Sequence, residues 1–378
     1  MIGVYMPKYF LNLGGNALTL GFIGAMGAVV QFFMLPLGGF AADCYGRRKI
    51  LVVTAFYGVL FPFFYFILQD WRLFALVSVF AAFGSLSGPA MRAMVADSVP
   101  PEKRTSGIAA LQVFSSLPQV IAPFIWGWLI ENLGWIDGFR AGCFYSIITA
   151  FISALIVGIF LKETLKKQST AKLGLSNNNS LVAGFSEVRH SLSTSLKALI
   201  IAYVFVVLAN GAVGQYYIIY ATDEIKLTAL QWSMIVSLQF LSASILKIPG
   251  AWVADKFGKR KVLLISMLSC APLTILFTIS HSFTQVLVVM LLLVVAGIYY
   301  GPTHEALQAD LTPRAMRGRI TALWSMVGAL GAASGALVGG WLFQTVNRTV
   351  PFYFFTAAEL IALIFLVVGV REPLKKEV

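Results

Sequence analysis

Apolar stretches follow one another along almost the whole of this 378-residue chain, and most are long enough to cross a membrane as a helix. A hydrocarbon core of about 30 Å needs about 20 apolar residues in helical form. Only 12% of the residues are charged, against about 25% in an average soluble domain. The sequence therefore predicts an all-α polytopic membrane protein. The predicted helices cover residues 1–12, 18–43, 49–69, 73–97, 105–132, 139–161, 195–221, 229–255, 261–280, 284–311, 317–344 and 351–370.

The first predicted helix is too short to span a membrane, since a dozen residues rise only about 18 Å. We expect that the chain begins partway along its first span, through truncation or a misplaced start codon; a short first helix is the alternative. The polar segment 162–194 is predicted to be a cytoplasmic linker, in which 181–192 could form an amphipathic surface helix. It separates an N-terminal six-helix bundle (1–161) from a C-terminal six-helix bundle (195–371), which a cytoplasmic tail (372–378) follows.

Most of the 28 lysines and arginines lie on alternate loops between the apolar stretches. This asymmetry is typical of a multi-pass protein whose basic loops face the cytoplasm. We therefore expect a cell-membrane protein, monomeric, with both termini and the linker cytoplasmic. The basic loops should contact anionic lipids of the inner leaflet rather than nucleic acid. The three cysteines, Cys44, Cys143 and Cys270, lack metal-ligand spacing, and none of the three histidines, His190, His281 and His304, lies in a Ser/His/Asp grouping. We therefore predict no metal, no cofactor and no enzyme.

The two halves of the chain repeat each other at an offset of 212–213 residues. GGFAADCYGRRK, beginning at Gly38, matches GAWVADKFGKRK, beginning at Gly250. GPAMRAMVADSVPPEKR, beginning at Gly88, matches GPTHEALQADLTPRAMR, beginning at Gly301. Six helices return each half to the same side of the membrane, so the repeats are parallel and related by an axis along the membrane normal.

The first of these motifs resembles the signature loop between the second and third helices of the major facilitator superfamily, and its echo lies between the eighth and ninth. The resemblance implies two pseudo-symmetric six-helix bundles that rock around a central cavity, which helices 1, 4, 7 and 10 would line. Helix 5 resembles more weakly, around Pro123 and Gly127, the glycine/proline motif of antiporters in that family. Close packing of small residues is the alternative explanation.

The signature loops and their acidic neighbours are predicted to form a cytoplasmic latch that holds one conformation and releases it. The alternative is that they only fix the topology. In the first half the latch residues are Gly39, Asp43, Gly46, Arg47, Arg48, Asp97 and Arg104. In the second half they are Gly250, Asp255, Gly258, Lys259, Arg260, Asp310 and Arg317.

Several charged side chains lie inside apolar spans, where each costs about 2.5–3.5 kcal/mol on insertion scales. Arg92 and Glu305 occupy matched positions of the two halves and could pair across the cavity. We predict that Glu305 is the protonation site, with Arg92, Lys247 or both as counter-ions; a static ion pair is the alternative. His304 could relay protons or simply be packed. For Glu359, in the last helix, we expect a structural or lipid-facing role.

Polar and aromatic residues of the predicted cavity helices are candidate substrate contacts. Aromatic belts and hydrogen bonds between helices would explain the same residues. The candidates are Gln112, Asn210, Gln215, Tyr216, Tyr217, Gln239, Tyr299 and Tyr300.

These features predict a secondary active transporter that moves a small organic solute by alternating access, coupled to proton antiport in the direction of efflux. Proton-coupled uptake or facilitated diffusion of sugars or other organic solutes is the first alternative. A membrane sensor that has kept a transporter scaffold without transporting is the second. No phosphate-binding loop of the form Gly-x4-Gly-Lys-Ser/Thr is present, which argues against an ATP-driven pump.

Overall fold

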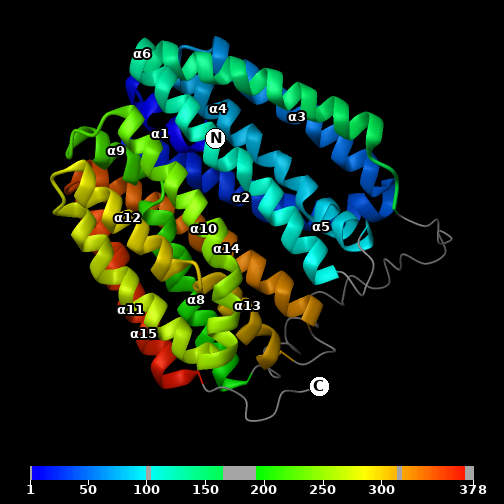
Figure 1. Cartoon of the computed structure of the whole chain (residues 1–378), viewed down its shortest axis with the longest axis vertical. Helices are drawn as coiled ribbons and strands as arrows, with labels where there is room; N and C mark the ends of the chain where they lie inside the picture. Colours follow the sequence, from blue (N-terminus) through cyan, green and yellow to red (C-terminus); the bar gives the residue numbers. More distant parts are fainter. Residues whose placement is uncertain (1, 99–103, 165–192, 313–316, 371–378) are drawn as a thin grey trace.

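The computed structural model describes residues 2–98, 104–164, 193–312 and 317–370. Within these ranges, the side chains of residues 96, 104–110, 112–113, 247–255, 317–319 and 322 lie outside the described part. The described chain is helical, with turns and short connections and without a strand. Figure 1 shows its two parts, one coloured from blue to teal and the other from green to red.

The helices agree closely with the predicted spans. The N-terminal half contains α1 (Ile2–Asn12), α2 (Ala17–Tyr45), α3 (Arg47–Ile67), α4 (Trp71–Ala81), the 3-10 helix η1 (Ala82–Leu86), α5 (Ser87–Ser98) and α6 (Arg104–Phe160). The C-terminal half contains α8 (Thr194–Val213), α9 (Tyr216–Asp223), α10 (Ala229–Phe257), α11 (Lys259–Thr278), α12 (Phe283–Gly297), α13 (Tyr300–Leu311), α14 (Arg317–Thr345) and α15 (Val350–Gly369).

Ten helical segments of the described chain are long and apolar enough to cross a membrane. One of them, 114–160, contains two of the predicted spans because the chain folds back at Gly134, whose φ of 81° is left-handed. A Cβ on Gly142 would lie 2.7 Å from the Trp126 ring, so the two arms pack face to face. When 114–160 is counted as two helices and α1, which has 11 residues, is added, the ten segments make up the two six-helix bundles.

Three predicted spans are interrupted where we expected continuous helices. The span 73–97 changes to the 3-10 helix η1 between α4 and α5. The span 195–221 breaks between α8 and α9, and 284–311 breaks between α12 and α13. Gly84, Gly214 and Gly297 lie at these interruptions. Glycine lowers helix propensity, and such breaks change the direction in which the following side chains point. The periodicity of an apolar stretch does not reveal them.

The two halves meet along two pairs of long helices, α2 with α14 and α6 with α10. Small residues let the backbones of the first pair approach closely. A Cβ added to Gly21 would lie 2.4 Å from the Ala336 carbonyl oxygen, and one added to Gly340 would lie 2.8 Å from the Ala17 carbonyl oxygen. Close glycine contacts of this kind stabilise helix pairs in membranes, where apolar side chains gain little from contact with each other rather than with lipid.

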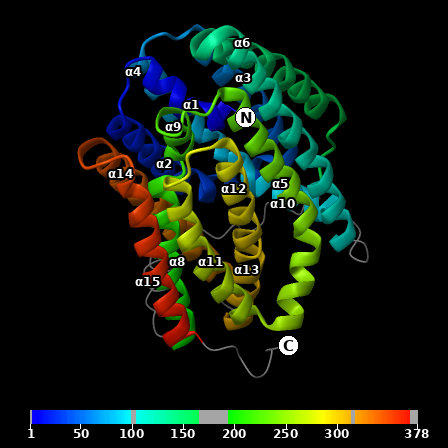
Figure 2. The same ribbon diagram turned by 60° about the vertical axis from the view of Figure 1, so that its left-hand side comes forward.

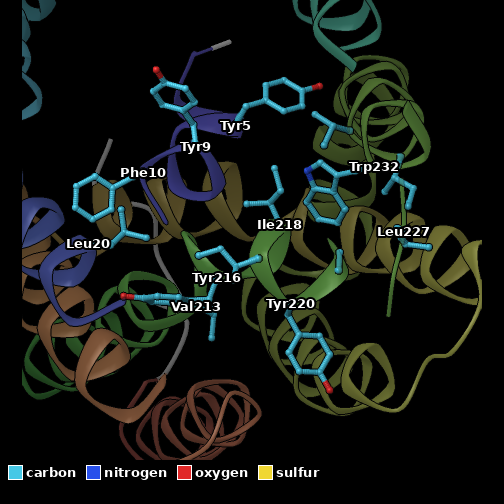
Figure 3. Packing of buried hydrophobic residues seen from close by; sticks show 14 of the residues in the cluster. Tyr5, Tyr9, Phe10, Leu20, Val213, Tyr216, Ile218, Tyr220, Leu227 and Trp232 are labelled. Atoms are coloured by element: carbon cyan, nitrogen blue, oxygen red, sulfur yellow. The ribbon is translucent and has the colours of Figure 1, made fainter. Parts of the chain in front are cut away.

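The two ends of the molecule differ. The basic end carries the signature loops 46–49 and 258–261. The opposite end holds an aromatic core in which Tyr5 and Tyr9 of α1 lie near Tyr216 and Trp232 of the C-terminal half (Figure 3). Tyr9 stacks on Phe139 with ring centroids 3.9 Å apart. This core joins the two halves at the end that lacks the basic loops.

Candidate functional site

The first signature loop connects three helix ends. Gly46 has a φ of 95° and precedes α3, and Arg47 forms an ion pair with Asp97 at the end of α5. Arg48 donates hydrogen bonds to the carbonyl oxygens of Leu161 and Gly158, at 2.7 and 2.8 Å. A cation at these carbonyls complements the negative end of the helix dipole.

Glu163 completes this first loop, and the sequence analysis missed it. Its carboxylate accepts hydrogen bonds from the backbone N–H groups of Arg47 and Arg48, at 3.3 and 3.0 Å. Asp43 is exposed, and the carboxylate at the start of α3 belongs to Glu163. Glu163 is distant in sequence and lies just after α6, so no local signal marks it.

The second signature loop repeats this geometry. Gly258 has a φ of 91°, Lys259 lies 2.5 Å from the Asp310 carboxylate, and Arg260 donates to the Val367 carbonyl oxygen at 2.6 Å. Each loop therefore joins the start of one helix to two others of its own half. Of the two glycines near the end of α2, Gly38 makes a close approach, since a Cβ there would lie 2.2 Å from the Leu86 carbonyl oxygen, whereas one on Gly39 would lie 3.9 Å from Pro89. The side chains of four predicted latch residues lie outside the described part: Arg104, Gly250, Asp255 and Arg317.

The opposite end holds the polar contacts between the halves. Lys8 of α1 forms an ion pair with Asp223 of α9. The Tyr5 hydroxyl donates to the Pro123 carbonyl oxygen at 2.8 Å and lies 2.7 Å from the Ser233 hydroxyl. Five hydrogen bonds between described residues of the two halves lie at this end. This conformation is therefore closed at the opposite end.

A cavity of about 530 Å³ lies towards the basic end, and we call it the Arg92/Glu305 cavity. Arg92 comes from α5 in one half and Glu305 from α13 in the other, so the structure brings together two residues that the sequence matched across the repeat. Both residues are exposed, and they form no ion pair with each other. The static ion pair that was the alternative to a protonation site is therefore absent from this conformation.

An aromatic wall closes one side of the Arg92/Glu305 cavity. His304, which is 4% exposed, has its ring 5.0 Å from that of Tyr203, 5.4 Å from Tyr300 and 5.3 Å from Trp324, measured between centroids. Its Nε2 atom has no hydrogen-bond partner among the described residues. His304 is therefore packed among aromatic rings while it also lines the cavity.

A second cavity of about 500 Å³, the Asn210/Gln239 cavity, lies mainly within the C-terminal half. Asn210, Tyr217 and Gln239 line it as candidate substrate contacts, and Val4 of α1 reaches it from the other half. Asn210 donates to the Val206 carbonyl oxygen at 2.8 Å, and Gln239 donates to the Met290 carbonyl oxygen at 3.3 Å. Aromatic side chains and fixed amides suit an amphiphilic organic molecule.

The remaining candidates fall elsewhere. Tyr216 is buried and donates to the Ala17 carbonyl oxygen at 3.1 Å, so it joins the halves. Gln215 packs against Gly24 of α2. Tyr299 lines a separate groove between α11 and α12, whereas Tyr300 lines the Arg92/Glu305 cavity. The side chains of Gln112 and Lys247 lie outside the described part.

Glu359 on α15 does not face lipid, so that part of our expectation is wrong. The residue is 5% exposed, and its Oε2 atom has no hydrogen-bond partner among the described residues. Phe352, Phe355 and Ala362 are buried on the same helix. Their spacing of three and four residues places Glu359 on the inward face, and this periodicity was the available signal in the sequence.

Two pseudo-symmetric helical bundles, a shared interface and an internal cavity with charges from both halves define a membrane transporter rather than an enzyme. The sequence profile of the Major Facilitator Superfamily matches residues 1–231 and 199–378. The chain belongs to this superfamily, as the signature loops predicted.

Two relatives are distant in sequence but match over most of the chain. Multidrug resistance protein 2 of Bacillus subtilis is 23% identical over 92% of this chain and 86% of its own length. The mouse major facilitator superfamily domain-containing protein 10 is 22% identical over 92% of this chain and 77% of its own length. The solved structure of a D-xylose–proton symporter superposes with a TM-score of 0.75 at 17% identity, covering 98% of this chain and 94% of that one. This structural similarity supports the fold.

Proposed function

We propose that the protein is a secondary active transporter that exports a small organic solute in exchange for protons, with Glu305 as the protonation site. One observation carries this proposal: Arg92 and Glu305 project from different halves into one cavity without pairing with each other. Unpaired opposite charges on two moving walls attract each other when the walls approach. A proton on Glu305, or an anionic group on Arg92, changes that attraction.

In alternating access, the distance between Arg92 and Glu305 would depend on which end of the protein is closed. In the described conformation, polar contacts between the halves hold the opposite end closed. When the basic end closes instead, α5 and α13 approach and Arg92 can pair with Glu305. Protonation of Glu305 would remove this pair and favour the open cavity. Because the proton stabilises one conformation more than the other, proton binding would be coupled to the movement of the halves.

The signature loops are proposed to act as the latch of this movement. The ion pairs Arg47–Asp97 and Lys259–Asp310 each tie the end of a cavity helix to a neighbour in its own half. They keep each half rigid at the basic end, so that each half moves as a rigid body. Following the charge asymmetry, we place the basic end, both termini and the linker in the cytoplasm. The protein then acts as a monomer in the cell membrane, in contact with anionic lipids.

The direction and the substrate class rest on the relatives and on the cavity walls. The Bacillus subtilis relative is named for multidrug resistance. A second relative, quinolone resistance protein NorA of Staphylococcus aureus, is 28% identical over 155 residues, 40% of this chain. The aromatic wall formed by Tyr203, Tyr300 and Trp324 would accept a flat or apolar group, beside the charged Glu305. We therefore propose amphiphilic organic compounds as substrates.

The test uses protein reconstituted in lipid vesicles and a fluorescent lipophilic cation as the probe. A pH gradient should drive counter-movement of the probe in the wild type, and Glu305→Gln should reduce this movement at least tenfold. Glu224→Gln is the matched control, because it makes the same chemical change at an exposed ion pair with Arg348. Movement of the probe in the same direction as protons would instead indicate uptake. Probe binding without movement would indicate a sensor, and an active, pH-coupled Glu305→Gln variant would refute the role of Glu305.

A further inference from the structure

The buried carboxyl group of Glu359 takes no part in the proposed coupling between Arg92 and Glu305. Glu359 is 95% removed from solvent, since only 5% of its surface is exposed, and one carboxyl oxygen lacks a hydrogen bond within the described chain. An ionised carboxylate in such a place is costly unless it is paired. An unpartnered polar atom that persists in the core of a transporter bundle points to a ligand that comes and goes.

The position of Glu359 relates it to both cavities. Its carboxyl group is close enough to Tyr217 and Cys270 to interact electrostatically with them, and both line the Asn210/Gln239 cavity. It interacts in the same way with Tyr300, which lines the Arg92/Glu305 cavity. Phe355, one helical turn earlier on α15, also lines the Asn210/Gln239 cavity. Glu359 therefore lies in the core of the C-terminal half, near residues that line each of the two cavities.

The charged surroundings of Glu359 are sparse. The titratable groups that interact electrostatically with it are Tyr217 from α9, Cys270 from α11 and Tyr300 from α13. The cations of α11, Lys259, Arg260 and Lys261, lie near the C-terminal end of α15, since Arg260 donates to the Val367 carbonyl oxygen. Lys197 is the charged residue of α8, and it lies near the far end of α15, because the adjacent Ala198 packs against Gly369. Ten residues of helix separate Gly369 from Glu359, about 15 Å. The described side chains of α14 carry no charge.

We propose that Glu359 is an occluded proton-binding site between the two cavities, distinct from Glu305. Water in one cavity supplies the proton, which forms the O–H bond of a neutral carboxylic acid. Release breaks that bond and returns the proton to water, directly or through a tyrosine hydroxyl. No redox partner or further reactant is needed. Glu359 would give the C-terminal bundle a place to hold a proton that is sealed from lipid and separate from the cavity charges.

Among the possible ligands, a proton fits this site better than a metal ion. The described residues contain no group of three or more His, Cys, Asp or Glu side chains that could hold a metal. The groups that interact electrostatically with Glu359 are two phenols and a thiol, which are poor ligands for hard cations. A neutral carboxylic acid is compatible with all of them.

Infrared difference spectroscopy of the full-length protein in lipid nanodiscs, stepped between acidic and alkaline buffer, tests the proposal. The wild type should show a carbonyl stretching band of a protonated carboxylic acid that appears and disappears with pH and shifts in heavy water. Glu359→Gln, which preserves the shape of the side chain, should abolish this band. Because Glu305 is itself proposed to bind a proton, Glu305→Gln is the matched variant: it should remove only the contribution of Glu305 and leave the Glu359 band in place.

The outcomes separate this site from the proposed role of Glu305. Loss of the band in Glu305→Gln together with its persistence in Glu359→Gln would overturn the proposal while leaving proton coupling at Glu305 intact. A Glu359 band of constant intensity at every pH would also overturn it, because the carboxyl would then be a static core group. Displacement of the band by sodium at fixed pH would identify a cation site instead. If Glu359→Gln folds poorly, the pH response of the same band in Tyr300→Phe and Tyr217→Phe decides, since removal of a facing hydroxyl should shift its midpoint.

Discussion

The two halves of this transporter agree at the basic end and differ around the cavities. Each signature loop has a left-handed glycine, a cation paired with an aspartate, and an arginine that donates to carbonyl oxygens at the end of the last helix of its half. The matched positions on α5 and α13 carry opposite charges, Arg92 and Glu305. The repeated parts form the scaffold, and the differing parts provide the chemistry.

The same contrast extends into the bundle cores. Tyr300, His304 and Trp324 form the aromatic wall in the C-terminal half, whereas the repeat places Ser87, Met91 and Leu111 at the matching positions of the N-terminal half. The repeat offset matches Glu359 with the region of Ser146. The C-terminal half therefore holds most of the groups that we propose to recognise solute or protons. The N-terminal half contributes Arg92 and the packing surface of α2 (Figure 2).

Reversing the charge of Arg92 should produce the largest effect. Arg92→Glu places two carboxylates on facing walls of one cavity, and like charges at close range cost several kcal/mol when the walls approach. We expect pH-driven transport of the fluorescent probe to fall about a hundredfold, since about 1.4 kcal/mol corresponds to a factor of ten. Adding Glu305→Arg should recover at least a tenth of the lost rate. If the double variant stays as inactive as Arg92→Glu alone, the two residues do not act as a pair.

Breaking the close contact between α2 and α14 should have an intermediate effect on stability. In Gly21→Ala the new Cβ would meet the Ala336 carbonyl oxygen at 2.4 Å, and backbone atoms have little freedom to move away. Overpacking of this kind costs about 1–3 kcal/mol, which should lower the thermal unfolding midpoint in detergent. Gly39→Ala is the control, because its nearest neighbour would be Pro89 at 3.9 Å. Equal midpoints for the two variants would contradict the described interface.

Removing one latch cation from each half should have the smallest effect, and the effect should be similar in both. Partly exposed ion pairs contribute about 0.2–1 kcal/mol, so Arg47→Ala and Lys259→Ala should each change the ratio of the two open conformations by less than about sixfold. Distances between spin labels on α5 and α13 measure that ratio. Arg72→Ala, at the opposite end, is the comparison. A large effect in one half alone would mean that the latch is not symmetric.

The sequence predicted the helices well because each span must satisfy its own backbone hydrogen bonds in lipid, which makes apolar stretches reliable markers. It also matched Arg92 with Glu305 through the repeat. It did not predict the breaks before Tyr216 and Tyr300, because glycines in apolar runs are common and only packing decides which of them bend a helix. The role of Glu163 was not predicted for a related reason: the helix whose N-terminus it binds is more than a hundred residues away in the sequence.

Composition and periodicity alone determined that this chain lies in a membrane, that it is duplicated, and that its loops carry paired glycines and charges. Those properties depend on local chemistry and on the internal repeat. Only the tertiary structure decided which charges share a cavity, that His304 is packed among aromatic rings, and that Glu359 faces inward. These outcomes depend on how helices rotate against one another, and a rotation of one residue, about 100° around a helix, moves a side chain from lipid to core.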